Sequence, residues 1–459
     1  MLKKKNRLGD SVDRLSTLPD DILCHILSFL PTKISVSTSI LSKRWRSIWA
    51  HVPTLDFGLS DYQTVMVGWP NIIRVMSLHE VQTLDSLRLI SPDYNTFELE
   101  KVIIFAMSRN VKNLDIRLKP QCTLPRLIFT ITTLVRLRIT SYQCDYKTGG
   151  NVHLPCLKWL HLGCIHFQVD EDLPRLLSGC PVLEELILDR VSFAEKKSGC
   201  FNVSSSSLKR LTVIMVGRVF YHDLLDPDCR VEINAPALIY LKVSLASKSI
   251  SVSPMTSLVE ANINMKYRAM DNEDDYYTTM VKFLHCLGHV NCLTLSGSYN
   301  KKFVDMALAA PFTMFDNLKK LVYHPRGKWY LLGKLLKVAN NLKILIVSSF
   351  TLLFSNEIYG CWEEQVPACV SSHLKTIRIL GMSAVEPEKN HIVRYLLENA
   401  KVLEKMEIYL DCYSLTEQRT KLVEFLSSIV RGSEACELVI RLHPFITRVL
   451  KNPDSQDNK

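Results

Sequence analysis

The sequence has no Cys-x-x-Cys pair among its 14 cysteines, and the spacing of these cysteines is irregular. An apolar leader is also missing after Met1, where Lys3, Lys4 and Lys5 stand instead. We therefore do not expect a secreted disulfide scaffold. We expect reduced thiols that pack as small hydrophobic side chains.

Apolar runs long enough to cross a bilayer are missing as well. The longest candidate, residues 342–354, is too short and is interrupted by Lys343, Ser348 and Thr351. We therefore expect no membrane partner.

A concentrated basic stripe is missing, although the net charge is +10, from 56 Lys plus Arg against 46 Asp plus Glu. Only residues 3–7 and 43–46 form short basic clusters, whereas a nucleic-acid binder usually gathers its basic side chains on one face. A nucleic-acid partner is therefore not expected. The cluster at 3–7 has two interpretations, a nuclear-import signal or a frayed terminus. We expect the protein in the nucleus and/or the cytoplasm.

Catalytic and cofactor motifs are missing too. There is no G-x-S-x-G elbow, and Gly149-Gly150 has no phosphate-binding frame around it. His285 and His289 have the i, i+4 spacing of metal ligands, but no Glu follows His285 and Gly288 weakens a helix there. The acidic residues within 271–275 are interpreted as a solvated insertion. We therefore expect no catalytic, metal or cofactor site, and no enzyme.

What is present is a long chain of globular composition. It has 459 residues, with 47% hydrophobic and 22% charged residues. This length predicts several domains or an elongated repeat array.

The first 60 residues carry a pattern of three short helices. Thr17 is expected to cap the first helix and Pro31 to end it. Its apolar positions are Leu18, Leu23, Leu27, Leu30 and the two isoleucines at 22 and 26. A second helix is expected from Lys33 to Leu41.

A third helix is expected after Ser42, which is placed to cap it. Trp45, Ile48 and Trp49 would share one face, and Pro53 would end the helix. So short a module cannot bury all of its apolar surface on itself. Its spare face packs either on the rest of the chain or on another protein, and the pattern alone leaves both open.

The strings LPDDIL at 18–23, ILSFLP at 26–31 and LSKRWRSIW at 41–49 resemble the plant F-box family. The resemblance implies that the segment from Asp13 to Phe57 binds a Skp-type adaptor, which joins a cullin scaffold. It also implies that the adaptor contact, or the small core behind it, is supplied by Leu18, Pro19, Ile22, Leu23, Ile26, Leu27, Leu30, Val36, Leu41, Trp45 and Trp49. The stretch 33–38 departs from the family's more usual acidic and alanine-rich form.

Beyond residue 80, a triplet of apolar residues recurs with the spacing i, i+3, i+5. The 13 triplets begin at Leu84, Val111, Leu134, Leu157, Leu183, Leu208, Leu238, Leu258, Val290, Leu318, Leu342, Leu374 and Leu403. Their starts differ by 20 to 32 residues, close to the leucine-rich repeat period of about 20–29. We predict a curved array of short parallel strands with one shared core. The region 80–350 resembles the irregular leucine-rich repeats of plant F-box proteins.

The C-terminal pattern predicts strand–helix–strand–helix–strand, a cap for an open array. A helix is expected from about Glu388, a second one after a capping box at Ser414 and Glu417, an end at Gly432, and a closing strand at 436–442. Residues 362–443 resemble the FBD domain. The expected fold is therefore α/β: a three-helix F-box, a leucine-rich-repeat solenoid and an FBD-like segment.

Two functional hypotheses follow. The preferred one is a non-catalytic substrate adaptor of a Skp–cullin–F-box ubiquitin ligase, whose repeats bind an unknown protein substrate. The alternative is a repeat scaffold, or a nucleic-acid binder, that acts outside a ligase.

Overall fold

The computed structural model describes residues 15, 17–58, 68–90, 95–119, 124–146, 150–193, 199–215, 230–245, 249–265, 273–297, 303, 315–325, 330–348, 365–382, 387–410 and 416–442. The basic cluster at 3–7, Asp13, and Ser414 of the expected capping box lie outside these residues. The chain divides into two compact units, residues 1–187 and 188–459.

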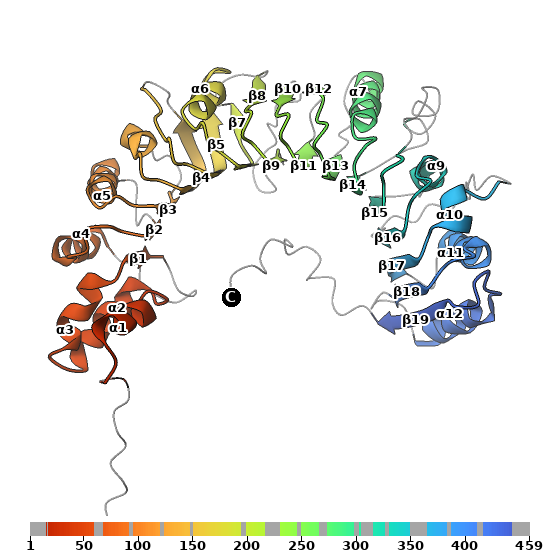
Figure 1. Ribbon diagram of the computed structural model, residues 1–459, viewed down its shortest axis with the longest axis horizontal. Helices are drawn as coiled ribbons and strands as arrows, with labels where there is room; N and C mark the ends of the chain where they lie inside the picture. Colours follow the sequence, from red (N-terminus) through yellow and green to blue (C-terminus); the bar gives the residue numbers. More distant parts are fainter. Residues whose placement is uncertain are drawn as a thin grey trace, which may run out of the picture. The chain divides into compact units, whose positions relative to one another are not determined.

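Unit 1 joins an N-terminal group of helices to a parallel sheet, as the sequence predicts. Its strands follow the order β1-β2-β3-β4-β5-β6, and α4 and α5 lie on one side of the first three (Figure 1). The helices are α1 (Asp20–Leu27), α2 (Thr32–Ser37), α3 (Trp45–Ile48), α4 (Trp69–Leu78), α5 (Thr96–Ser108) and α6 (Asp172–Ser178), with 3-10 turns η1 (Thr38–Ile40), η2 (Trp49–His51) and η3 (Arg126–Thr130). The strands are β1 (Thr54–Phe57), β2 (Ser86–Ile90), β3 (Asn113–Arg117), β4 (Arg136–Tyr146), β5 (Trp159–Phe167) and, at the boundary of the units, β6 (Glu185–Asp189).

Unit 2 continues the same alternation of strand and covering segment. Its main sheet follows the order β9-β11-β13-β14-β15-β16-β17-β18-β19, and β12-β10-β8 form a smaller sheet. The strands are β7 (Ser192–Phe193), β8 (Cys200–Ser204), β9 (Arg210–Ile214), β10 (Arg230–Asn234), β11 (Tyr240–Leu245), β12 (Ser249–Val252), β13 (Glu260–Met265), β14 (Cys292–Gly297), β15 (Lys320–Pro325), β16 (Ile344–Ser348), β17 (Thr376–Met382), β18 (Lys405–Leu410) and β19 (Glu437–Leu442). The helices are α7 (Glu273–His285), α9 (Tyr330–Val338), α10 (Ala368–Ser372), α11 (Pro387–Asn399) and α12 (Thr416–Ser428).

The apolar triplets form the core of both units, and this prediction is confirmed. Every residue of the 13 triplets is at most 2% exposed. In each triplet the first residue precedes a strand and the other two lie on it, and parallel partners fall in register, as in Leu87↔Leu114 and Leu89↔Ile116. A strand buries alternate residues. The residue between the second and third triplet positions therefore lies on the opposite face, which we call the open face.

Backbone hydrogen bonds join each turn to the turn before it. The amide of Lys112 donates to the carbonyl of Leu84, that of Val135 to Lys112, and that of Lys158 to Val135. The main chain therefore supplies hydrogen bonds between successive repeats.

The C-terminal part confirms the expected order, since β17, α11, β18, α12 and β19 follow one another and the strands pair in parallel. Two details differ. α12 ends at Ser428, not at Gly432. The amide of Gly432 instead donates to the carbonyl of Leu397, and a Cβ atom at residue 432 would lie 2.3 Å from the carbonyl oxygen of Glu398. The glycine is therefore needed for this close approach to the end of α11.

Two polar regions that stand out in the sequence also have a defined place in the structure. The acidic residues from Glu273 to Asp275 lie on α7, whereas Asp271 lies outside the described residues. The ring Nε2 of His289 lies 2.7 Å from the carbonyl oxygen of Met255, so this histidine has a structural partner.

Candidate protein-docking surface

The N-terminal module, residues 15–58, contains the three expected helical segments, but their ends differ from the expectation. α1 begins after Pro19 and is not capped by Thr17, because a residue that precedes proline, here Leu18, is disfavoured in the helical conformation. α1 ends at Leu27, and Pro31 instead precedes α2. The third helix begins after Arg44 without a side-chain cap, so Ser42 does not cap it.

The module has its own buried core. Seven buried residues form one cluster: Leu23, Leu27, Trp45, Ile48, Trp49, Ala50 and Val52. Leu18, Cys24, Val36 and, from α4, Val75 pack against it. Trp45 and Trp49 are thus core residues, and the module folds around them without using its whole apolar surface.

The apolar surface that remains is exposed. Of the 17 large hydrophobic side chains that are exposed among the described residues, eight lie between residues 15 and 41. They are Leu15, Ile22, Ile26, Phe29, Leu30, Ile34, Ile40 and Leu41, and we call them the docking surface. Phe29 is 75% exposed and Ile40 is 88% exposed. Exposed apolar side chains concentrated in one module are one characteristic of protein-binding surfaces.

α1 divides its apolar residues between the core and this surface. Leu23 is fully buried, whereas its neighbour Ile22 is 45% exposed. One turn later Leu27 is buried and Ile26 is exposed. The sequence indicated one wide stripe, and the structure separates it into two faces, since adjacent residues on a helix lie about 100° apart.

Polar contacts fix how α1 and α2 present these side chains. The Arg44 guanidinium binds Asp20, with Nε 2.8 Å from the carboxylate oxygen, and also donates to the carbonyl of Leu18. The Ser35 hydroxyl donates to the carbonyl of Leu27 at 3.1 Å in the buried space between the helices. Both contacts hold the start and the end of α1 against the rest of the module.

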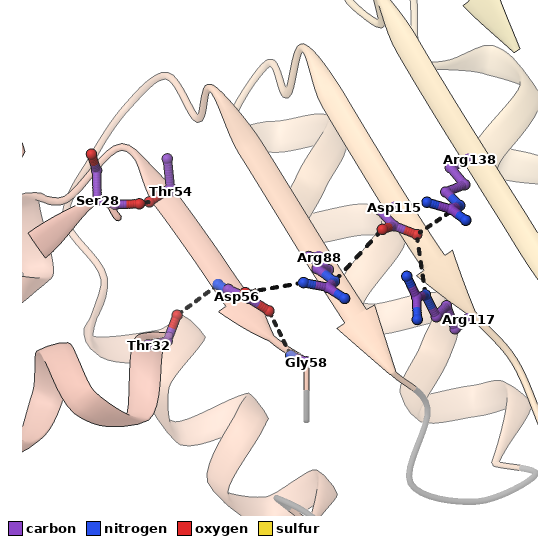
Figure 2. A network of polar contacts seen from close by, with 9 residues as sticks. All are labelled: Ser28, Thr32, Thr54, Asp56, Gly58, Arg88, Asp115, Arg117 and Arg138. Atoms are coloured by element: carbon purple, nitrogen blue, oxygen red, sulfur yellow. Dashed lines mark hydrogen bonds and ion pairs between the residues drawn. The ribbon is translucent and has the colours of Figure 1, made fainter. Parts of the chain in front are cut away.

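The module is joined to the repeat sheet through β1, which pairs in parallel with β2. The Thr54 hydroxyl donates to the carbonyl of Ser28 at 3.1 Å, and the amide of Asp56 donates to the Thr32 hydroxyl at 2.7 Å (Figure 2). The strand that starts the sheet therefore also hydrogen-bonds the helices. The docking surface and the first repeats form one compact piece.

A buried histidine reinforces this joint. The ring Nε2 of His79 donates to the carbonyl of Val52 at 2.9 Å, and the Arg109 side chain donates to the carbonyl of His79 at 3.1 Å. Burial lowers the pKa of His79, with a smaller contribution from Arg109. Its Nδ1 atom is buried and has no hydrogen-bond partner among the described residues.

Three further observations concern metal ions, membranes and thiols in the described part of the chain. No group of three or more His, Cys, Asp or Glu side chains that would suit a metal ion occurs there. None of the described helices has the length and apolar character that crossing a membrane requires. The cysteines within the described residues are free thiols.

Family models match three parts of the chain: the F-box domain at residues 15–56, the LRR repeats of the FBD-associated F-box protein At5g56370 at 99–226, and FBD at 363–408. The F-box/FBD/LRR-repeat protein At1g78750 of Arabidopsis thaliana is 31% identical over 94% of this chain and 96% of its own length. The putative FBD-associated F-box protein At5g56440 of the same plant is 32% identical, over 93% and 99%. The chain belongs to the plant F-box/FBD/LRR-repeat family.

Membership of this family confirms the three expected modules and points to an adaptor role in a ubiquitin ligase. The matched ranges lie inside the predicted regions 13–57, 80–350 and 362–443, whose boundaries stay predictions. The 11 residues proposed for the adaptor contact fall into three groups. Exposed are Pro19, Ile22, Ile26, Leu30 and Leu41; half-buried are Leu18 and Val36; buried are Leu23, Leu27, Trp45 and Trp49.

Four exposed residues of the docking surface were missed by the sequence analysis: Leu15, Phe29, Ile34 and Ile40. Phe29 follows Ile22 and Ile26 at i+7 and i+3, so helical spacing could have found it. Ile34 lies four residues after Leu30, but Pro31 interrupts the helix between them, and Leu15 lies before α1.

Proposed function

We propose that this protein is a non-catalytic substrate receptor of a Skp–cullin–F-box ubiquitin ligase. Its docking surface binds a Skp-type adaptor, and its repeats hold a protein target. The observation that carries the proposal is the gathering of exposed apolar side chains at 15–41 over a core that is already complete. A module that packed only on its own chain would bury these side chains.

The joint through β1 supports the same proposal. A receptor accelerates ubiquitin transfer by holding its target near a separate enzyme, so its benefit is effective concentration. A flexible linker would dilute that benefit. Here Thr32 and Thr54 bond the docking helices to the strand that opens the sheet.

Adaptor binding by the full-length chain tests the proposal. The wild type is expected to co-purify with a Skp-type adaptor, and Ile22→Asp is expected to abolish this because a carboxylate would enter an apolar interface. Ile104→Asp is the matched control, since Ile104 is 52% exposed on α5, away from the docking surface. Its co-purification should stay at the wild-type level.

Two outcomes would refute the proposal: no adaptor bound by the folded wild type, or equal loss in both variants. The first outcome would favour a repeat scaffold that acts outside a ligase. We further propose that the protein works in the nucleus and/or the cytoplasm. A fluorescent fusion that localises elsewhere would contradict this.

A further inference from the structure

Unit 1 carries a cluster of arginines on its open face, at a distance along the chain from both short basic runs. Arg88 on β2, Asp115 on β3 and Arg138 on β4 are register partners, and Arg117 follows on β3. Figure 2 shows the three guanidinium groups turned toward the single Asp115 carboxylate. We call Arg88, Arg117 and Arg138 the arginine cluster.

These arginines are incompletely paired. The Nε atoms of Arg88, Arg117 and Arg138 lie 3.6, 4.0 and 4.0 Å from Asp115 oxygens, which is too long for hydrogen bonds. The three Nε atoms are buried and hydrogen-bond nothing among the described residues. Arg88 has a second carboxylate, that of Asp56, at 3.6 Å.

Positive charge is therefore in excess at the arginine cluster. Three guanidinium groups face two carboxylates, and Arg136 adds a fourth cation on β4. Burial lowers the pKa of Arg117, and Arg88 and Arg138 lower it further, against the opposite effect of Asp115. The three side chains are still 37–40% exposed, so their remaining donors are accessible to a ligand.

An aromatic side chain lies beside the arginine cluster. Arg136 is the register partner of Trp159, and its guanidinium lies 4.3 Å from the centre of the Trp159 ring. Trp159 is half-buried on β5. Arginine and tryptophan together are the residue types that dominate binding energy at protein interfaces. On the next strand Glu185 has the opposite charge, so the basic surface ends at β5.

The size of this surface favours a peptide. Arg88 and Arg138 lie two strand spacings apart, about 10 Å, and Arg117 is two residues beyond Asp115, about 7 Å along the strand. In an extended peptide, alternate side chains are also about 7 Å apart. A nucleic acid would need a longer basic track.

From these contacts we propose that the arginine cluster with Trp159 binds an acidic, extended segment of the protein that the repeats hold. This inference rests on the proposed function, because it names the chemistry of the target. Carboxylates of the segment would accept hydrogen bonds from the guanidinium donors, and an apolar neighbour would contact Trp159. Such charge-assisted bonds are the stronger kind.

Fluorescence anisotropy with the full-length chain tests this proposal. The probe is a short labelled peptide that alternates Glu and Ser and ends in Phe, and its control has Gln in place of Glu. The Glu peptide is expected to bind at least about tenfold more tightly, and added salt should remove the difference. Arg117→Gln with Arg138→Gln should reduce Glu-peptide binding to the level of the Gln peptide.

Arg74→Gln with Arg175→Gln is the matched control, since both are exposed arginines on the helices α4 and α6 of the same unit. It should bind like the wild type. If circular dichroism shows that the cluster variant does not fold, Arg117→Lys with Arg138→Lys tests the proposal instead. Its affinity for the Glu peptide is expected to lie between that of the wild type and that of the Gln peptide.

Unchanged discrimination between the two peptides in the folded cluster variants would overturn the proposal. Equal loss in the control variant would do so too, as would binding of inorganic phosphate or single-stranded RNA at the cluster without binding of the Glu peptide. Adaptor co-purification of the wild type separates the two proposals. If the wild type binds the adaptor but not the Glu peptide, the ligase role stands and the arginine-cluster proposal fails. If it binds the Glu peptide but no adaptor, the arginine-cluster proposal stands and the ligase role fails.

Discussion

Ile22 and Leu23 are neighbours on α1, and the structure predicts opposite consequences when each is replaced by Ala. Leu23 is fully buried in the module core, so Leu23→Ala is expected to cost about 2–5 kcal/mol of stability. Ile22 is 45% exposed, and Ile22→Ala should change stability by less than about 0.5 kcal/mol. Its effect should appear in binding.

The binding loss at Ile22 can be worked out from the carbons removed. Truncation to Ala deletes three carbons, worth about 2 kcal/mol if all were newly buried against the adaptor. Because only 45% of the residue is exposed before binding, about 1 kcal/mol remains. That corresponds to about a fivefold weaker Kd.

Two measurements on each variant give the answer. Urea unfolding followed by tryptophan fluorescence includes the signal of Trp45 and Trp49, two of the six tryptophans of the chain, which both lie in the module core. Titration with a Skp-type adaptor gives the Kd. If Ile22→Ala lowers the urea midpoint as much as Leu23→Ala does, the division of α1 into two faces is wrong. If Ile22→Ala binds the adaptor as tightly as the wild type, Ile22 is not part of the contact.

Two further predictions concern the buried His79 and the closely packed Gly432. Burial lowers the pKa of His79 in the folded protein, so the unfolded state binds more protons and stability should fall as the pH drops below about 6.5. Between pH 7.5 and 5.5, His79→Gln should lose less of its urea midpoint than the wild type. An equal loss would contradict the role of His79 in this pH dependence. Gly432→Ala places a Cβ 2.3 Å from the Glu398 carbonyl and should cost about 1–3 kcal/mol in thermal unfolding, whereas Gly150→Ala, with no heavy atom within 4 Å of the new Cβ, should change little.

The repeat core was predictable from the sequence because its signal is local and repeated. Each triplet spans only six residues, of which the last two apolar ones lie on a strand, and the register of neighbouring strands then follows from the shared apolar face. The helix ends were less predictable. Thr17 and Ser42 are good capping residues by type, but whether they cap depends on neighbours such as Pro19, which forces the chain before it into an extended conformation.

The arginine cluster was missed for a different reason. A search for runs of basic residues examines neighbours in sequence, whereas Arg88 and Arg138 are 50 residues apart and meet only through strand register. Aligned on their triplets, both occupy the position between the second and third apolar residues, with Asp115 between them and His161 beyond. Aligning the repeats on their triplets would therefore have predicted that these residues lie side by side.

The same alignment of the repeats connects the proposed adaptor contact with the proposed target contact. Asp56, on the strand that closes the docking module, stands in that same column and faces Arg88 at 3.6 Å (Figure 2). The amide of Asp56 also donates a hydrogen bond to the hydroxyl of Thr32, the first residue of α2. A segment bound at the arginine cluster would compete with Asp56 for Arg88. Under the two proposals, target binding and the module joint would therefore share the Arg88 side chain, which lies on the strand next to β1.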